Sequence, residues 1–301
     1  VKLKKIIMKL IDCFMYFDED MLLDIRLNTL NKFVSKFIIC EANYKHNGLK
    51  KKLNFDIKKF AKFKDKINYI VLENQPKNLH IINESDNEEI KKNKIIDNGQ
   101  IRETFQRNFS TNEILKFSDE DLIIINDLDE IPNLENFRYR KKINIFKQRM
   151  FYYKFNLEYP NFDWLGSKIC KIKHLQSPQW LRSIKGKKYP FWRLDTLVSK
   201  KKYNNLEFIE SGGWHFTNIM TPEILDKKMR AFSHHLEYEE SGYNSEKLSE
   251  LIKNKKVLYN HAADKKDENK WQEGKSLQSV SLKNLPEYIT KNHQRFKSWI
   301  D

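Results

Sequence analysis

The segment Asp121–Pro132 places three carboxylates directly after a short apolar stretch, and it constrains the fold more than any other part of the chain. Leu122–Ile125 is rich in β-branched residues, as is typical of a strand buried on both faces of a parallel sheet. Pro132 prevents further ladder pairing on that strand. Asp127 and Asp129 are two residues apart, so their side chains point the same way on an extended chain.

Like charges at the end of a strand repel one another unless a cation lies between them. Open α/β sheets bind their ligands at the carboxyl ends of the parallel strands. We therefore expect a hard divalent cation at Asp127 and Asp129, shared with a phosphate-bearing substrate. The spacing alone is equally compatible with an acidic turn that begins the next helix.

Apolar stretches alternate with amphipathic segments in the first 132 residues. The predicted strands are Ile6–Phe17, Phe37–Cys40, Ile67–Leu72 and Leu122–Ile125, and the predicted helices cover residues 18–33, 56–64 and 100–117. This order predicts an α/β fold with a mostly parallel sheet and right-handed crossovers. The polar segment Asn83–Gly99 lacks apolar periodicity, and we expect a mobile surface insertion there.

The pattern changes after Pro132, where aromatic residues alternate with polar ones. We expect a short helix at Leu134–Lys141, a strand or hairpin at Ile143–Phe155 and a helix that starts at Thr221. The predicted organisation is a domain of residues 1–260, divided into a nucleotide-binding half (1–132) and an acceptor half (133–260). A polar helical extension of residues 261–301 follows.

Composition excludes several classes of protein. A content of 40% hydrophobic and 13% aromatic residues predicts a folded globule. The three cysteines show no metal-ligand spacing and indicate a reducing compartment. No apolar stretch approaches the roughly 20 residues that span a bilayer, and no signal peptide is evident. We therefore expect a cytoplasmic protein.

The formal net charge of +15 suits an anionic partner. The lysines are spread along the chain, so charge alone does not select among nucleotide phosphates, an acidic glycan, a membrane surface and nucleic acid. Peripheral contact with a membrane through the basic surface is compatible with this distribution.

Six blocks of residues occur in the order seen in glycosyltransferase family 17, and the sequence resembles that family from about residue 6 to residue 236. The blocks are Asp12-Cys13-Phe14, Ile25-Arg26-Leu27, Ile38-Ile39-Cys40-Glu41-Ala42, Gln106-Arg107-Asn108, Asp127-Leu128-Asp129-Glu130-Ile131-Pro132 and Gly213-Trp214-His215-Phe216. An acidic triplet alone is a weak signal, but six ordered blocks together are fairly specific.

The resemblance implies a GT-A-like, Rossmann-type fold, a mixed aromatic-rich acceptor half, Mn²⁺ (or Mg²⁺), UDP-GlcNAc as donor and inversion at the sugar carbon. The family includes enzymes that add the bisecting GlcNAc of N-glycans. This sequence departs from the animal members in lacking a membrane anchor and secretory disulfides. A surface polysaccharide or lipid-linked glycan therefore fits better as the acceptor.

The expected metal ligands are Asp129 directly, Asp127 through water or by holding the ribose instead, and His215. His215 follows two glycines that permit close approach of a ligand, although a lone histidine beside a tryptophan is by default a core residue. Glu130 is expected to support the site from behind or to cap a helix.

Five further residues are candidates for binding the donor: Asp12, Glu41, Arg107, Arg230 and His234. Asp12 and Glu41 end predicted strands on the same sheet edge, where capping is an equal alternative. Arg107 could hold the diphosphate bidentately or pair with Glu103 four residues earlier. Arg230 and His234 share a helix face, which is also consistent with a solvated basic surface.

An inverting displacement needs a carboxylate as base. Glu210 is the first candidate, followed by Asp195 and Asp163. Trp164, Trp180, Trp192 and Trp214 could stack on sugar rings, although core packing is the commoner fate of tryptophan.

Two other classes of function remain open from the residues alone. Clustered carboxylates also serve metal-dependent phosphoryl transfer or hydrolysis, but no Walker-type glycine loop is present. A basic nucleic-acid-binding protein would have only its charge as support, because no recognised motif accompanies it. We expect no nucleic-acid partner.

Overall fold

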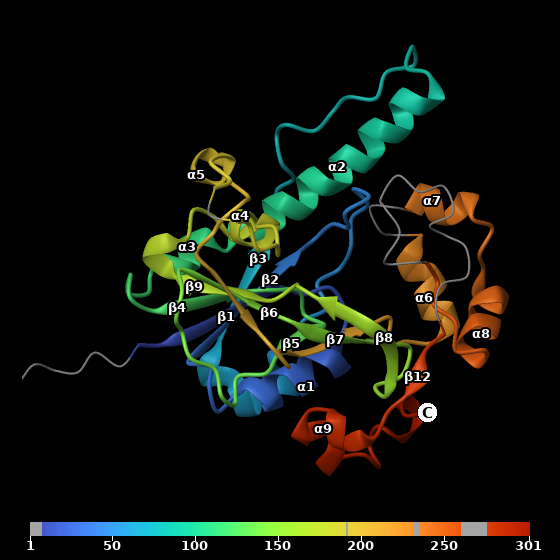
Figure 1. Cartoon of the computed structure of the whole chain (residues 1–301). Helices are drawn as coiled ribbons and strands as arrows, with labels where there is room; N and C mark the ends of the chain where they lie inside the picture. Colours follow the sequence, from blue (N-terminus) through green and yellow to red (C-terminus); the bar gives the residue numbers. More distant parts are fainter. Residues whose placement is uncertain (1–7, 191, 231–234, 260–275) are drawn as a thin grey trace, which may run out of the picture.

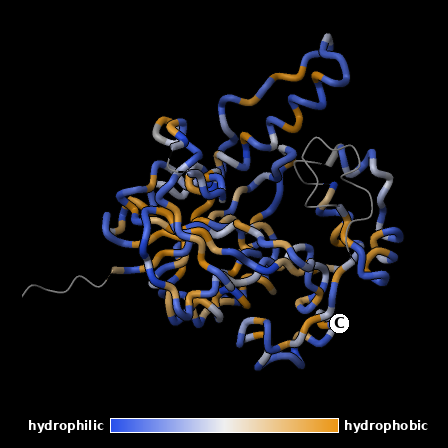
Figure 2. Tube along the Cα trace, viewed as in Figure 1, coloured by the Kyte–Doolittle hydropathy of each residue, from blue (hydrophilic) through white to orange (hydrophobic). Residues whose placement is uncertain are grey.

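A computed structural model gives the structure of residues 8–190, 192–230, 235–259 and 276–301 (Figure 1). Hydrophobic residues are concentrated in the central sheet and the elements packed against it (Figure 2). Within these ranges, no helix combines the length and the apolar character that crossing a bilayer requires.

A seven-stranded sheet forms the centre, in the order β10-β6-β9-β4-β1-β2-β3. Its strands are β1 (Leu10–Met15), β2 (Lys36–Ala42), β3 (Ile67–Leu72), β4 (Leu122–Ile125), β6 (Ile143–Phe146), β9 (Lys168–Lys171) and β10 (Leu206–Ile209). The strands β3, β2, β1 and β4 pair in parallel, whereas β9 is antiparallel to both β4 and β6. The predicted α/β class with a mostly parallel sheet is confirmed.

A second sheet of five strands has the order β12-β8-β7-β11-β5. These strands are β5 (Glu130–Pro132), β7 (Gln148–Tyr152), β8 (Leu157–Trp164), β11 (Gly213–Thr217) and β12 (Gln278–Ser279). β5 begins at Glu130, five residues after β4 ends at Ile125, so the acidic segment connects the two sheets. β11 lies between β5 and β7, and its register places His215 opposite Glu130.

Helices cover both faces of the central sheet. The helical elements of the chain include α1 (Asp20–Leu30), the 3-10 segment η1 (Ile57–Lys66), α2 (Glu88–Phe109), α3 (Thr111–Ile114), α4 (Pro178–Ser183), α5 (Asp195–Val198), α6 (Pro222–Met229), α7 (His235–Glu240), α8 (Ser245–Lys253) and α9 (Glu287–Lys291). Of these, α6, α7 and α8 pack against β7 and β8 of the second sheet. The face with Phe14 and Ile39 packs on α1, η1 and α9, and the face with Cys13 and Ile38 packs on α3 and α4. All three cysteines are buried free thiols.

Two predicted segments are wrong. Within Asn83–Gly99, expected to be an insertion without structure, α2 begins at Glu88 because the Asn87 side chain caps it by accepting from the Ile90 N–H (2.8 Å). The first part of α2 projects away from the sheet, so it has no need of an apolar stripe (Figure 1). Leu134–Lys141 is not helical, because its Leu134 and Phe137 side chains enter the core from an irregular chain.

Candidate functional site

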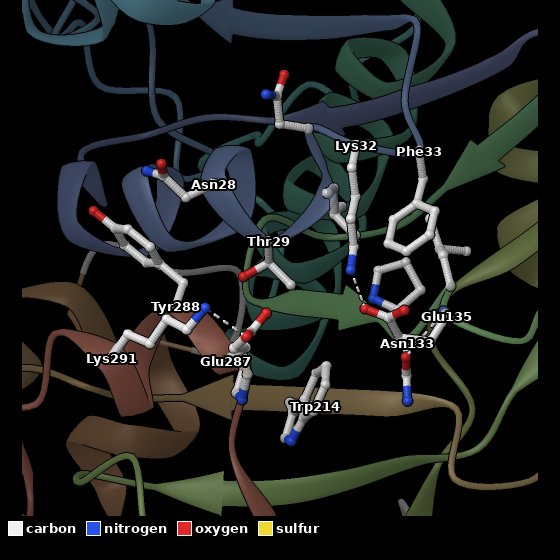
Figure 3. A pocket seen from close by; sticks show the side chains of 15 residues that line it. Asn28, Thr29, Lys32, Phe33, Asn133, Glu135, Trp214, Glu287, Tyr288 and Lys291 are labelled. Atoms are coloured by element: carbon white, nitrogen blue, oxygen red, sulfur yellow. Dashed lines mark hydrogen bonds and ion pairs between the residues drawn. The ribbon is translucent and has the colours of Figure 1, made fainter.

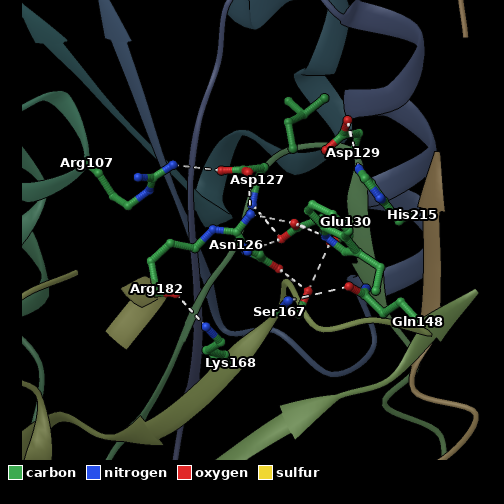
Figure 4. Close-up of polar contacts among 12 residues, drawn as sticks. Arg107, Asn126, Asp127, Asp129, Glu130, Gln148, Ser167, Lys168, Arg182 and His215 are labelled. Carbon is green, nitrogen blue, oxygen red and sulfur yellow. Dashed lines mark hydrogen bonds and ion pairs between the residues drawn. The ribbon is translucent and has the colours of Figure 1, made fainter. Parts of the chain in front are cut away.

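The acidic segment of residues 127–130, which we call the acidic loop, lies at the carboxyl end of β4 (Figure 4). Asp127 retains 35% exposure of its side chain and Asp129 retains 23%, whereas the Glu130 side chain is fully buried. Glu130 folds back, and its carboxylate accepts the Asp127 N–H (3.0 Å). The side chains of Asp127 and Asp129 therefore face the solvent, while the buried Glu130 carboxylate supports the loop backbone.

Arg26 of α1 supports the acidic loop from the protein interior and has no exposed surface. Its guanidinium donates to the carbonyl oxygens of Glu130 (2.6 Å), Leu128 (3.2 Å) and Asp127 (3.3 Å), to the Asn126 side chain (2.5 Å) and to both oxygens of Asp12 (2.7 and 2.8 Å). The remaining loop carbonyl, that of Asp129, accepts the Phe216 N–H of β11 (2.9 Å). All four carbonyl groups of the loop are thus held.

Asp12 and Glu41, two of the predicted donor-binding residues, are fully buried and committed to internal partners. Asp12 pairs with Arg26 and also accepts from the Asn126 amide (3.0 Å). Glu41 accepts from Lys51, from the N–H groups of residues 54 (2.8 Å) and 55 (3.1 Å), and from the Tyr69 hydroxyl (2.8 Å). Glu41 therefore fixes the end of β2, whereas Asp12 lies inside β1 rather than at the strand end where it was expected, and holds Arg26 there.

Two arginines converge on Asp127. Arg107, near the end of α2, donates to Asp127 Oδ1 (3.0 Å), and Arg182 of α4 donates to Oδ2 (2.6 Å). Arg107 also pairs with Glu103 (2.8 Å), so the predicted salt bridge forms beside the contact with the loop. Burial acts to raise the pKa of Asp127, but the charges of Arg182 and Arg107 outweigh it and hold that pKa below its usual range.

Arg182 was not among the predicted site residues, yet it forms the largest ionic network of the site. Besides Asp127 it binds both oxygens of Glu130 (2.9 and 2.7 Å). The Trp164 indole N–H donates to the same carboxylate. A Cβ at Gly166 would lie 2.0 Å from Glu130 Oε1, so only glycine permits this packing.

Lys168 of β9 lies next to Arg182 and is nearly buried (Figure 4). Its ammonium donates to the carbonyl oxygens of Arg182 (2.5 Å) and Ile184 (2.7 Å). Burial, together with the neighbouring Arg182 charge, lowers its pKa to about 7. These bonds hold the end of α4, and with it Arg182, against the sheet.

Asp129 and His215 form the second part of the site, with 3.4 Å between Asp129 Oδ2 and His215 Nε2. The imidazole stacks on the Trp164 ring at 4.6 Å. Its buried Nδ1 has no hydrogen-bond partner among the described residues, so no bond at that nitrogen fixes the tautomer.

A carboxylate oxygen and an imidazole nitrogen are both ligand types that Mn²⁺ accepts, so this pair fits the expected cation. Asp127 fits less well, because both of its oxygens are engaged by arginine. In the described parts of the chain, no group of three or more His, Cys, Asp or Glu side chains could hold a metal ion. A cation at Asp129 and His215 would therefore need further ligands from a substrate or from water.

Asp18 and Glu19 follow β1 and share a cationic neighbour with Asp129. Lys228 of α6 pairs with Glu19 (3.5 Å). Burial acts to lower the pKa of Lys228, but the charges of Glu19, Asp129 and Asp18 outweigh it, so that the pKa is raised. Crowding by protein atoms and the Glu19 charge raise the pKa of Asp18, which nonetheless has an exposed side chain. Neither Asp18 nor Lys228 was assigned a role from the sequence.

The three carboxylates predicted as candidate bases, Glu210, Asp195 and Asp163, form ion pairs outside the acidic loop. Glu210 is 72% exposed on the turn before β11 and pairs with Lys147 (2.9 Å), which also contacts Asp163 (3.4 Å). Asp195 is held by Arg193 (2.8 Å) and Lys202 (2.6 Å), whose hydrogen bonds lower its pKa below the usual range. A carboxylate paired in this way is a weak base.

Of the basic pair expected on the α6 helix, Arg230 is exposed and bonded to Asp226 (3.0 Å). His234 lies outside the described residues. The structure thus brings together Asp127, Asp129, His215 and Arg107 from the predicted set.

A cavity of about 250 Å³ lies on the other face of β11, between α1, α9 and the chain after β5 (Figure 3). Trp214 lines it, while the next residue, His215, faces Asp129. Alternation along the strand accounts for this division, because successive side chains point to opposite faces.

These features define an α/β protein with a charged cluster at the carboxyl edge of its parallel strands, the edge where open α/β sheets bind ligands. The chain belongs to glycosyltransferase family 17, since the sequence model described as Glycosyltransferase family 17 matches residues 2–300. Membership of this family supports transferase activity. A search among curated proteins found no match.

Proposed function

We propose that this protein is a metal-dependent, inverting glycosyltransferase with a GT-A-like fold that moves a sugar, GlcNAc as first candidate, from a UDP-sugar to a glycan hydroxyl. The proposal is carried by one observation: Asp129 beside His215, and Arg107 with Arg182, converge on the same loop. The first pair suits a divalent cation, and the second suits a diphosphate.

Asp129 and His215 would hold Mn²⁺ or Mg²⁺. The ion would supply a Lewis acid that neutralises charge on the departing diphosphate. Arg107 and Arg182 would bind phosphate oxygens directly, because a planar guanidinium matches two such oxygens at once. Asp127 accepts from both arginines, and on donor binding it would become free to accept from a ribose hydroxyl or a metal-bound water.

Asp18 is the better candidate for the base on the acceptor hydroxyl. It is exposed, lies at the carboxyl end of β1 and has a raised pKa, which makes a carboxylate a stronger proton acceptor. Glu210, the first candidate from the sequence, remains the comparison. If Asp18→Asn keeps transfer and Glu210→Gln loses it, the order of the two is reversed.

The decisive experiment measures UDP release from UDP-GlcNAc, UDP-Gal and UDP-Glc with Mn²⁺, together with the thermal shift produced by UDP, ATP and an oligonucleotide. UDP with Mn²⁺ should raise the melting temperature, because a ligand that binds only the native state stabilises it. Stabilisation by ATP or the oligonucleotide but not by UDP would instead favour phosphoryl transfer or nucleic-acid binding.

Variants locate the activity. Asp129→Ala should abolish UDP release, and Arg182→Lys should weaken UDP binding by about ten-fold, because lysine cannot make the paired contacts. Glu135→Ala is the control, since this exposed residue forms an ion pair with exposed Lys32, away from the acidic loop. Full activity of Asp129→Ala in Mn²⁺ would refute the metal assignment.

A further inference from the structure

The chain between α4 and β10, residues 185–202, forms a loop that includes α5 and stands off the central sheet (Figure 1). We call it the 185–202 loop. It has seven basic residues and one acidic residue. Within the described part of this range, no residue forms an ion pair with the acidic loop.

The 185–202 loop exposes large apolar side chains. Val198 is 85% exposed, Leu194 is 72% exposed and Trp192 is 66% exposed. Figure 2 shows hydrophobic positions in this outlying loop, away from those of the sheet. Single exposed apolar residues are common, but several on one short projection mark a surface for interaction.

Polar contacts hold the described residues of the loop. The Trp180 indole N–H donates to the Lys200 carbonyl (2.9 Å), and the Lys185 N–H donates to the Lys201 carbonyl (2.9 Å). Thr196, which is nearly buried, accepts from the Asn204 amide (2.9 Å). The short α5 turn thus points its threonine inward and Leu194 and Val198 outward, the reverse of the usual arrangement on a water-facing surface.

Basic side chains surround the exposed apolar ones. Five lysines of the loop are exposed: Lys185, Lys187, Lys188, Lys200 and Lys201. The only carboxylate, Asp195, is neutralised by its bonds to Arg193 (2.8 Å) and Lys202 (2.6 Å). The outer surface of the loop is therefore both apolar and strongly positive.

We propose that the 185–202 loop docks the protein on an anionic phospholipid membrane. Trp192, Leu194 and Val198 enter the boundary between headgroups and acyl chains, and the lysines contact the lipid phosphates. Nucleic acid would match the charge but would leave the aliphatic side chains in water. A neutral protein surface would match the aliphatic groups but not the lysines.

Docking would also place the site relative to the membrane. Arg182 of α4 lies three residues before Lys185, so the loop and the arginine that binds Asp127 are parts of one continuous segment. The acceptor would then be a glycan carried on a membrane lipid. This consequence rests on the proposed function, whereas the docking itself does not.

The test is co-sedimentation of the full chain with vesicles of phosphatidylcholine alone or mixed with phosphatidylglycerol. Binding should require the anionic lipid and should weaken as salt is raised. Leu194→Ser with Val198→Ser, and separately Lys187→Glu with Lys188→Glu, should each lower the partition coefficient about ten-fold.

Two matched controls should bind like the wild type. Lys283→Glu with Lys291→Glu makes the same change in net charge on another exposed surface, and Ile81→Ser removes an apolar residue of 77% exposure. Wild-type binding by the loop variants, or equal losses in the controls, would overturn the proposal. So would a change of oligomeric state in the loop variants, which would identify a second copy as the occupant. UDP release with a soluble acceptor should be unchanged in all of them, which keeps this test separate from that of the catalytic function.

Discussion

At the scale of single residues, the acidic loop owes its shape to Arg26. A buried guanidinium is costly unless its donors are satisfied, and here they reach Asp12, Asn126 and three loop carbonyls. The positive charge also lies over the Phe14 ring at 4.6 Å. Asp12 therefore acts on the loop through Arg26.

Replacing Arg26 by methionine should destabilise the protein by about 3–5 kcal/mol, because the buried Asp12 charge loses its partner. Urea unfolding followed by circular dichroism measures this change. Lys32→Met, which breaks an exposed pair with Glu135, should cost less than about 1 kcal/mol. If the free energy of unfolding fell by similar amounts in the two variants, Arg26 would contribute no more to stability than an exposed ion pair.

The site residues that could be predicted are those marked by their local sequence. Asp127 and Asp129 follow an apolar strand, and His215 follows two glycines, so the local sequence together with the family resemblance made them candidates. Arg182 could not be found in this way, since its role arises only when α4 packs against β4 and β9. The partners of Glu41 could not be predicted for the same reason, because they come from the following loop and from β3.

At the scale of elements, two strands of the central sheet were predicted well, the half-buried edge strand β3 and the fully buried β4. Ile67–Leu72 and Leu122–Ile125 have the expected bounds, because continuous apolar stretches leave few other conformations. The first half of α2 was missed, since a helix that projects into solvent is held by its cap and intrahelical bonds rather than by an apolar face. Strand pairing of β5 with β11 was beyond reach, because these short strands meet across 80 residues of chain.

The link between β8 and β9 also matters to the site. Gly166→Ala should displace the Glu130 carboxylate and its Trp164 partner, and it should destabilise the fold by roughly 1–3 kcal/mol. The melting temperature and the affinity for UDP should both fall. Gly186→Ala is the comparison, because its nearest neighbour is the end of the flexible Leu165 side chain, and a smaller loss is expected there.

At the scale of the whole molecule, one hydrophobic core joins the expected halves. It includes Leu30 of α1, Phe146 and Phe216 from beyond residue 132, and Ile289 and Phe296 near the carboxyl end. Tyr288 and Arg295 also bond to Asp24 of α1 (2.9 and 2.8 Å). The described part of the predicted extension thus packs directly on α1, the helix that carries Arg26.

Shortening a side chain within this shared core should destabilise the entire fold. Ile289→Ala should lower the free energy of unfolding by about 2–5 kcal/mol, because it opens a cavity among buried side chains. Ile224→Ala, at a position 49% exposed on α6, should change it by less than about 0.5 kcal/mol. A separate early unfolding transition in Ile289→Ala would contradict a single shared core.

The four fixed carbonyls of the acidic loop bear on how it meets a ligand. Backbone freedom at residues 127–130 is lost during folding, so little entropy remains to be lost when a ligand arrives. A preorganised frame of this kind adapts poorly to ions of the wrong radius. Under the proposed function, the loop would therefore favour Mn²⁺ or Mg²⁺ over Ca²⁺, whose oxygen ligands lie farther from the ion.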